Sequence, residues 1–341
     1  MRRVWAPGRV NLIGEHTDTT GGLVMPMAIE LGLTAVVEVG GSTIHLVSDD
    51  TTSPLRVDLP CDRPAEVTPQ WGRYVAGVAH VLDAHTGFTG TLSSTLPAGA
   101  GLSSSAALEV AVALALGAEG TAAQIAEWGR QAETLATGVR CGIMDQLASA
   151  GGIDGHAMLI DCSTLEITPV RIPEGFAVSV IHSGQHRALA TSEYSERRAQ
   201  CEAAEASIGP LRSAGPDDWH TIDDPVVAAR ARHVIGENTR VREFAAALSR
   251  DDIKACGDVL DRSHASLRDD FDVSTDRVDA VVELVRHRPG VTGCRITGAG
   301  FGGCVVALHH EDTDLEGLSL GGNQLRTWRV RASRGAFAVD D

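Results

Sequence analysis

Residues 97–107 read Pro97-Ala98-Gly99-Ala100-Gly101-Leu102-Ser103-Ser104-Ser105-Ala106-Ala107, and they join a strand-like run to a helical one. Glycines let the backbone approach a ligand closely, and the open N–H groups at the start of a helix favour an anion such as phosphate. The serine hydroxyls can bind phosphate or ligate Mg²⁺. An ordinary glycine turn followed by a serine helix cap has the same composition. Taken alone, the segment leaves both interpretations open.

A second polar segment lies near the N-terminus and reads Gly8-Arg9-Val10-Asn11-Leu12-Ile13-Gly14-Glu15-His16-Thr17-Asp18. Carboxylates and an imidazole close together suit the vicinal hydroxyls of a polyol or sugar. The spacing matches no metal-ligand pattern such as H-E-x-x-H. A solvated polar loop is the simpler interpretation of such a segment in isolation.

A third segment, Gly298-Ala299-Gly300-Phe301-Gly302-Gly303, formally satisfies the dinucleotide-binding pattern G-x-G-x-x-G. That pattern should open a helix, whereas the apolar residues 305–308 that follow continue as another strand. We therefore reject dinucleotide binding. The segment predicts a glycine-rich hairpin pressed against a ligand or another loop, and a tight turn without a binding role is the alternative.

Composition narrows the class of protein. The chain has 341 residues, of which 43% are hydrophobic and 22% charged, as in globular proteins that are not membrane-spanning. Its formal charge of −16 disfavours nucleic acid and anionic membranes as partners. Lys254 is the single lysine, so the sequence has no obvious lysine for a Walker phosphate loop or for a Schiff base. Seven cysteines without a C-x-x-C pair, and no secretory h-region, predict reduced thiols and a cytoplasmic location.

Hydrophobic periodicity predicts an α+β protein in both halves, without a regular βαβ alternation. Pro173 begins a polar seam, which divides the chain into expected domains 1–173 and 174–341. We expect strands over residues 9–13, 34–39, 44–48, 55–59, 157–161, 165–172, 177–182, 291–297, 304–309 and 326–332, and helices over 71–85, 106–116, 122–136 and, with breaks, 191–288.

Together the three segments resemble the GHMP small-molecule kinase superfamily, and residues 8–18 are similar to the signature of its galactokinase family. Further similar segments are Trp71 with residues 74–77, 141–146, 192–202 and 263–270, so the resemblance spans about residues 5–310. It implies a two-domain fold with a ribosomal-protein-S5-like α/β domain, a ferredoxin-like α+β domain and an active site in the cleft between them.

The resemblance also implies roles for individual residues. Asp145 would accept the proton of the sugar C1 hydroxyl, and Arg9 would orient that carboxylate. The sugar would contact Glu15, His16, Thr17, Asp18, Gly142 and Tyr194. Mg²⁺ would be held by Ser105 and Glu133. The ATP phosphates would lie on the loop Gly99, Ala100, Gly101, Leu102, Ser103, Ser104 and Ser105, with Ser48 near the nucleotide.

The implied activity is transfer of phosphate from ATP, with Mg²⁺, to C1 of α-D-galactose by a monomer or weak homodimer. Phosphoryl transfer requires positioning, charge neutralisation and a proton acceptor, none of which needs lysine. The alternatives are another sugar (N-acetylgalactosamine, arabinose or galacturonate), a non-catalytic galactose and ATP sensor, and a kinase for a non-sugar alcohol. Thr19-Thr20 replaces the family's usual Tyr-Asn, which predicts an altered sugar pocket, and the acidic segment 311–324 is poorly matched.

Overall fold

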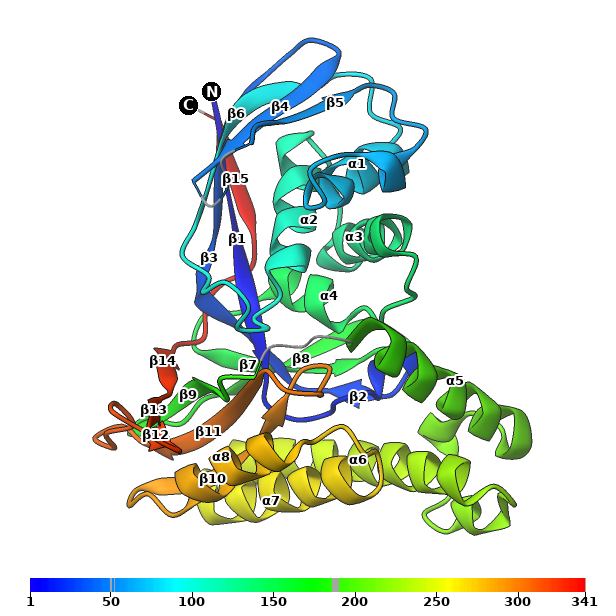
Figure 1. The fold of residues 1–341 in the computed structure, drawn as a ribbon, viewed down its shortest axis with the longest axis vertical. Helices are drawn as coiled ribbons and strands as arrows, with labels where there is room; N and C mark the ends of the chain where they lie inside the picture. The colour runs from blue at the N-terminus through cyan, green and yellow to red at the C-terminus, as the bar shows by residue number, and fades with distance from the viewer. Residues whose placement is uncertain (50, 52, 186–189, 341) are drawn as a thin grey trace.

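A computed structural model describes residues 1–49, 51, 53–185 and 190–340 of the chain. A six-stranded sheet with the strand order β15-β1-β3-β6-β4-β5 forms the upper half in Figure 1. Four helices, α1–α4, cover one face of this sheet. The strands are β1 (Arg2–Asn11), β3 (Pro26–Val39), β4 (Thr43–Ser48), β5 (Leu55–Asp58), β6 (Phe88–Ser94) and β15 (Phe337–Asp340), and the helices are α1 (Gly72–Val81), α2 (Ser104–Ala115), α3 (Ala122–Thr137) and α4 (Met144–Gly151).

The lower half is built on a four-stranded sheet with the order β10-β11-β9-β14, against which α7 and α8 pack. A three-stranded sheet, β2-β7-β8, lies between the two halves. The remaining elements are β2 (Leu23–Val24), β7 (His156–Asp161), β8 (Glu166–Arg171), β9 (Phe176–His182), β10 (Val291–Thr297), β11 (Cys304–His310), β12 (Ser319–Leu320), β13 (Asn323–Gln324), β14 (Arg326–Val330), α5 (Ala190–Ile208), α6 (Pro225–Ser249), α7 (Ile253–Asp269) and α8 (Asp276–Arg286), with short 3₁₀ turns η1 (Asp18–Thr20), η2 (Pro64–Glu66), η3 (Leu211–Ser213) and η4 (Asp218–Thr221).

Helix α2 is central to the upper half because it is buried on all sides, and all its buried residues are small or apolar except Glu109. It packs against β1 and β3 on one side and α1, α3 and α4 on the other. Helix α3 begins at a capping box in which the Thr121 hydroxyl accepts the Gln124 N–H and the Gln124 side chain accepts the Thr121 N–H. It ends at Gly138, whose φ is +74°. These local signals fix both ends of α3, which faces the cavity described below.

Helix α4 and the short strands β2, β12, β13 and β15 were not predicted from the sequence, and β6 was expected only as a strand-like run before residue 97, without bounds. Strand β15 pairs antiparallel with β1, in the register Arg2↔Asp340, so residues 337–340 belong to the sheet of the first half although they follow the whole second half. Pro173 lies between β8 and β9, and the chain crosses between the halves a second time after β14 to form β15. Pairing with β15 satisfies the outer edge of β1, which would otherwise expose unpaired backbone groups.

The third glycine segment is a hairpin turn, as predicted. Strand β10 ends at Thr297 and pairs with Cys304, the first residue of β11, across residues 298–303. The strand that follows excludes a Rossmann turn. All seven cysteines are free thiols. Among the described residues, no helix combines the length and the apolar character needed to cross a membrane.

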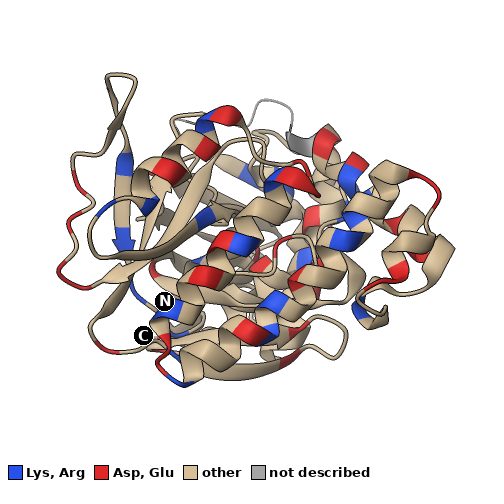
Figure 2. Ribbon diagram, turned by 90° about the horizontal axis from the view of Figure 1, so that it is seen from below, with Lys and Arg blue, Asp and Glu red and all other residues tan. Residues whose placement is uncertain are grey.

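Basic and acidic positions are interspersed along the helices (Figure 2). Arg198 pairs with Glu202 at 2.9 Å, and Arg286 pairs with Asp261 at 3.1 Å. The positive charge of these two arginines is therefore offset by a neighbouring carboxylate. The arrangement agrees with the negative net charge of the chain.

Candidate active site

A cavity of about 770 Å³ opens where the 97–105 loop, the 14–18 turn and helices α3 and α4 meet. Most of the residues predicted for the site line it: Arg9, Glu15, His16, Asp18, Gly99, Gly101, Leu102, Ser103, Ser104, Ser105, Glu133, Gly142, Asp145 and Tyr194. Thr17, Ser48 and Ala100 do not belong to this lining. The two halves of the chain and three distant sequence segments therefore share one cavity.

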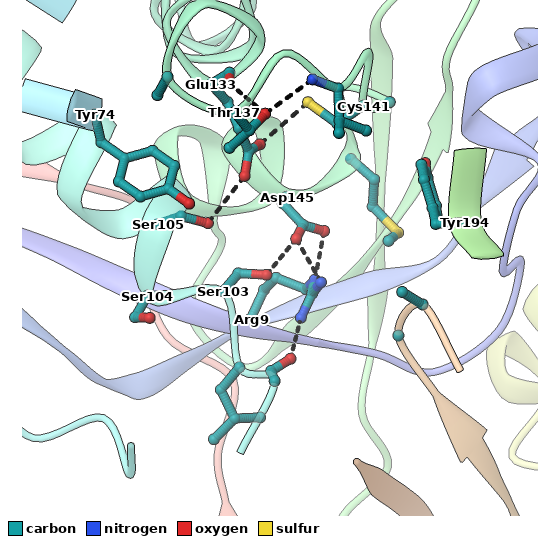
Figure 3. Close-up of a pocket in the computed structure, with 18 of the residues that line it drawn as sticks. Arg9, Tyr74, Ser103, Ser104, Ser105, Glu133, Thr137, Cys141, Asp145 and Tyr194 are labelled. Carbon is teal, nitrogen blue, oxygen red and sulfur yellow. Dashed lines mark hydrogen bonds and ion pairs between the residues drawn. The ribbon is translucent and has the colours of Figure 1, made fainter. Parts of the chain in front are cut away.

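Asp145 lies in the first turn of α4 and is held from two sides (Figure 3). The Arg9 guanidinium donates from Nε to Oδ1 at 2.7 Å and from Nη2 to Oδ2 at 2.5 Å. The Ser103 hydroxyl donates to the same Oδ2. Arg9 also donates from Nη1 to the Gly101 carbonyl at 2.9 Å. These hydrogen bonds fix the orientation of the Asp145 carboxylate. Because its side chain is still 29% exposed, it stays accessible from the cavity.

The 97–105 loop turns sharply just before α2. Gly99, Gly101 and Ser103 have φ angles of +72°, +69° and +60°, which only glycine adopts without cost. The Ser103 side chain does not cap α2, since it bonds to Asp145 instead. The first N–H groups of α2 therefore lack a side-chain cap, and the positive end of the helix dipole lies at the cavity, where it would favour an anion. The loop is held against β1 by the Arg9 N–H, which donates to the Leu102 carbonyl at 3.1 Å.

The two residues predicted to bind Mg²⁺ are in contact with each other. Ser105 donates to Oε1 of Glu133 at 3.1 Å, and the Cys141 thiol donates to Oε2 at 3.1 Å. Burial raises the pKa of Glu133 above its ordinary value, and the nearby Asp145 charge raises it further. The hydrogen bond from the Cys141 thiol lowers this pKa but does not cancel the effect of burial. A hydroxyl and a carboxylate are hard oxygen donors and fit Mg²⁺. The described residues contain no cluster of three His, Cys, Asp or Glu side chains, so a metal here would take further ligands from phosphate or water.

Asp18 shares the cavity with Asp145 and depends on a glycine for its position. Burial foremost, and then the Asp145 carboxylate, raises the pKa of Asp18 to about 6. Its Oδ1 accepts the Thr19 N–H at 3.0 Å. A Cβ atom placed at Gly142 would lie 1.7 Å from its Oδ2. Gly142 thus leaves the space that the Asp18 carboxylate occupies.

The side chains of Thr19 and Thr20 turn away from the cavity. The Thr20 hydroxyl donates to the Thr17 carbonyl at 2.9 Å, and that of Thr19 is 3.4 Å from the His16 carbonyl. Neither residue lines the cavity. Thr19 and Thr20 therefore do not shape the described cavity by direct contact. Their hydroxyls instead hydrogen-bond to carbonyls of the turn in which they lie.

His16 and Tyr194 are ring neighbours at the edge of the cavity. The His16 imidazole stacks on Phe271, with ring centroids 4.4 Å apart, and lies 5.8 Å from the Tyr194 ring. Burial, and then the nearby His233, lowers the pKa of His16 to about 3, so its imidazole is neutral. Tyr194 lies on α5, in the second half of the chain, and its side chain lines the cavity (Figure 3).

Glu15 links the 14–18 turn to the glycine hairpin. Its Oε1 accepts the Gly298 N–H at 3.0 Å and the Thr297 hydroxyl at 3.2 Å, and its Oε2 pairs with the fully buried Arg295. Arg295 also donates to the Leu12 carbonyl at 2.8 Å. The hairpin therefore presses against another loop, as predicted. Sequence reasoning missed Arg295, although an arginine inside an apolar strand is a recognisable signal.

Helix α6 supports the same turn with three buried polar residues that were also missed. Glu237 accepts the Gly14 N–H at 3.1 Å, Asn238 accepts the Leu23 N–H at 2.7 Å, and His233 lies 3.2 Å from the Glu15 carbonyl. The pKa of Glu237 is lowered to about 2, because Arg240 and other positive partners outweigh its burial. The spacing 233, 237 and 238 places these side chains on one face of α6. A polar face of the second half thus holds a loop of the first.

Models of known families match three parts of the chain. The galactokinase galactose-binding signature matches residues 3–39, the N-terminal domain of GHMP kinases matches residues 73–152, and their C-terminal domain matches residues 244–319. The first match contains the 8–18 segment, and the second contains the 97–107 loop and Asp145. The matches thus cover most of the cavity lining, with Gln70 and Tyr194 outside them.

Solved structures agree with these matches. Galactokinase of Lactococcus lactis is 29% identical over 98% of this chain and 94% of its own, with a TM-score of 0.91. Mevalonate kinase of Methanococcus jannaschii, at 20% identity, 97% and 98% coverage and a TM-score of 0.68, shares the fold. So does a D-glycero-D-manno-heptose 1-phosphate kinase from Bacteroides thetaiotaomicron, at 12% identity, 100% and 99% coverage and a TM-score of 0.61. The two-domain fold and the family predicted from the sequence are confirmed: the chain belongs to the GHMP kinases and is a galactokinase-like sugar kinase.

Proposed function

We propose that this kinase transfers the terminal phosphoryl group of ATP to the C1 hydroxyl of α-D-galactose, giving galactose 1-phosphate and ADP by direct in-line transfer. One observation carries the proposal: a single cavity is lined by both the 97–105 loop and the 14–18 turn, with the Asp145 carboxylate between them. The Lactococcus lactis galactokinase, 29% identical to this chain, is described as complexed with galactose.

Asp145 is the proton acceptor in this mechanism. Arg9 holds both of its oxygens, which leaves the carboxylate in one orientation relative to the sugar hydroxyl. The Ser103 hydroxyl ties the same carboxylate to the 97–105 loop, so that the proton acceptor and the phosphate site keep a fixed separation. Positioning of this kind is the main requirement of phosphoryl transfer.

The negative charge of the phosphates is met by the start of α2 and by the Arg9 guanidinium. Ser105 and Glu133 would hold Mg²⁺, which when bound neutralises charge on the phosphate oxygens. The sugar hydroxyls would be bound by Glu15, His16, Asp18 and Tyr194, all in the lining. Thr17 would act indirectly, because its hydroxyl lies within hydrogen-bond distance of the Gly14 and Leu23 carbonyls, either of which can accept its proton, and so closes the turn.

A coupled assay of ADP formation across galactose, N-acetylgalactosamine, arabinose, galacturonate and glucose tests the substrate. We expect the highest kcat/KM for galactose, and a preference for another sugar would refute galactose as the substrate. Loss of the general base typically costs about 10²–10⁴-fold, so the Asp145→Asn variant should lose that much kcat while binding ADP normally. Wild-type protein that binds galactose and ATP without forming ADP would instead be a sensor.

The cellular setting completes the proposal. Seven free thiols accord with a reducing compartment, so we place the enzyme in the cytoplasm, where ATP is also available. A small-molecule sugar and ATP are its expected ligands, and it would act as a monomer or a weak homodimer. Sedimentation at working concentration measures the oligomeric state directly.

A further inference from the structure

A fully buried glutamate lies behind the predicted metal ligands. Glu109, on α2, has 0% exposure, and its Oε2 accepts a hydrogen bond from Nε2 of Gln146 at 2.8 Å. Its Oε1 has no hydrogen-bond partner among the described residues. A buried carboxyl group is costly unless it is neutral or paired. No role proposed so far explains why it is there.

Gln146 connects this glutamate to the site. Its Nε2 also donates to Oε2 of Glu133, at 2.7 Å, so both hydrogens of one amide group are used by carboxyl groups on two different helices. Gln146 is itself fully buried and directly follows Asp145 on α4. A Cβ at Gly129 of α3 would lie 2.9 Å from the Gln146 Cγ, so that glycine leaves the room the amide needs.

We infer that Gln146 is a positioning residue that fixes the carboxylate of Glu133 relative to Asp145, and that Glu109 holds the Gln146 amide in the orientation required. The inference rests on the proposed function, because it concerns the residue that would bind Mg²⁺. Without Gln146, Oε2 of Glu133 would keep only the thiol of Cys141, which is a weak donor. Partners of metal ligands fix the orientation of those ligands in this way.

Glu109 is suited to support an amide next to a second carboxylate. Burial, and then the charge of Glu133, raises the pKa of Glu109 well above its ordinary value. In its neutral form it accepts a hydrogen bond through Oε2 without adding a second negative charge behind Glu133. An amide group in its place would offer the same acceptor oxygen, whereas an alkyl group would not.

The Gln146→Met variant keeps the volume of the side chain and removes both donated hydrogen bonds. Calorimetry of ADP binding at increasing Mg²⁺ measures the metal requirement without turnover. We expect the Mg²⁺ concentration for half-maximal enhancement to rise about 10–100-fold, as for other partners of metal ligands, while KM for galactose stays within about threefold. Gln131→Met is the matched control, because Gln131 donates to Glu127 at 2.8 Å on the exposed face of α3.

The support from Glu109 is tested by two variants. Glu109→Leu should raise the Mg²⁺ requirement in the same direction, and Glu109→Gln, which restores an acceptor oxygen, should recover most of the loss. Should Gln146→Met melt below the assay temperature, Gln146→Asn is measured instead. It keeps the amide but is one methylene too short to reach both carboxyl groups, and the same rise is expected.

An unchanged Mg²⁺ requirement in a folded Gln146 variant would overturn the inference while leaving the proposed function standing. An equal loss of galactose binding and metal binding would also overturn it, because general damage to the fold would then explain both. If wild-type protein showed no Mg²⁺-dependent ADP binding, the proposed function would fail first and this inference with it.

Discussion

Replacing Gly142 by alanine should impair sugar binding and spare nucleotide binding. The added Cβ would lie 1.7 Å from Oδ2 and 2.1 Å from Cγ of Asp18, whereas real Cβ contacts essentially never fall below 3.0 Å. The carboxylate must therefore move by about 1.3 Å, the difference between 3.0 and 1.7 Å. Because a misplacement of about 1 Å in a site can cost about 10²-fold, we expect kcat/KM for galactose to fall about 100-fold.

The assay varies galactose at saturating ATP and measures ADP binding separately by calorimetry. Gly120→Ala is the matched control, since its nearest neighbour is the flexible end of the Gln124 side chain at 3.1 Å and the residue is exposed. We expect the ADP affinity of Gly142→Ala to stay within about twofold of wild type, because the phosphate loop is not displaced. A folded Gly142→Ala enzyme with a wild-type kcat/KM for galactose would refute the placement of Asp18 in the sugar site.

Three further predictions follow from buried polar groups. Glu237→Gln should destabilise the fold by about 1–3 kcal/mol in urea unfolding and raise KM for galactose more than KM for ATP, whereas the exposed Glu243→Gln should change neither. Since the pKa of Asp18 is raised to about 6, the carboxylate is protonated below that pH, so kcat/KM for galactose should fall as pH drops through 6 and Asp18→Asn should flatten the profile. Arg295→Met leaves Glu15 buried without its cation and should cost about 3–5 kcal/mol of unfolding free energy; a loss below about 1 kcal/mol would contradict this pairing.

Elements with a strong period were predictable from the sequence. The helical spacing of residues 122–136 matches α3, and the strand at residues 44–48 matches β4. Helix α4 was missed because it has only eight residues, too few for a period to emerge beside the glycines that flank it. Strand β15 was missed because its pairing with β1 joins residues at opposite ends of the chain.

The residues of the candidate site also differ in how well the sequence predicted them. Residues within compact motifs, such as Arg9 and Asp145, were identified through the resemblance, and the structure brings them into contact. Ala100 lies outside the cavity lining although Gly99 and Gly101 belong to it, because neighbours within one segment face different directions. No residue of the strand that contains Ser48 lines the cavity. Glu237 and Arg295 act on residues more than 200 positions away. An arginine inside an apolar strand stands out in the sequence, but a single sequence does not show which distant residue it contacts.

The support that α6 gives to the 14–23 segment affects how the two halves can be recombined. A hybrid protein that joins residues 1–173 to the second half of a different kinase would keep every residue of the 14–23 segment. It would lack the side chains of Glu237 and Asn238, which hold this segment in its conformation. If the 14–18 turn binds the sugar as proposed, sugar specificity depends on two distant segments, and a search for new specificity should vary both at once.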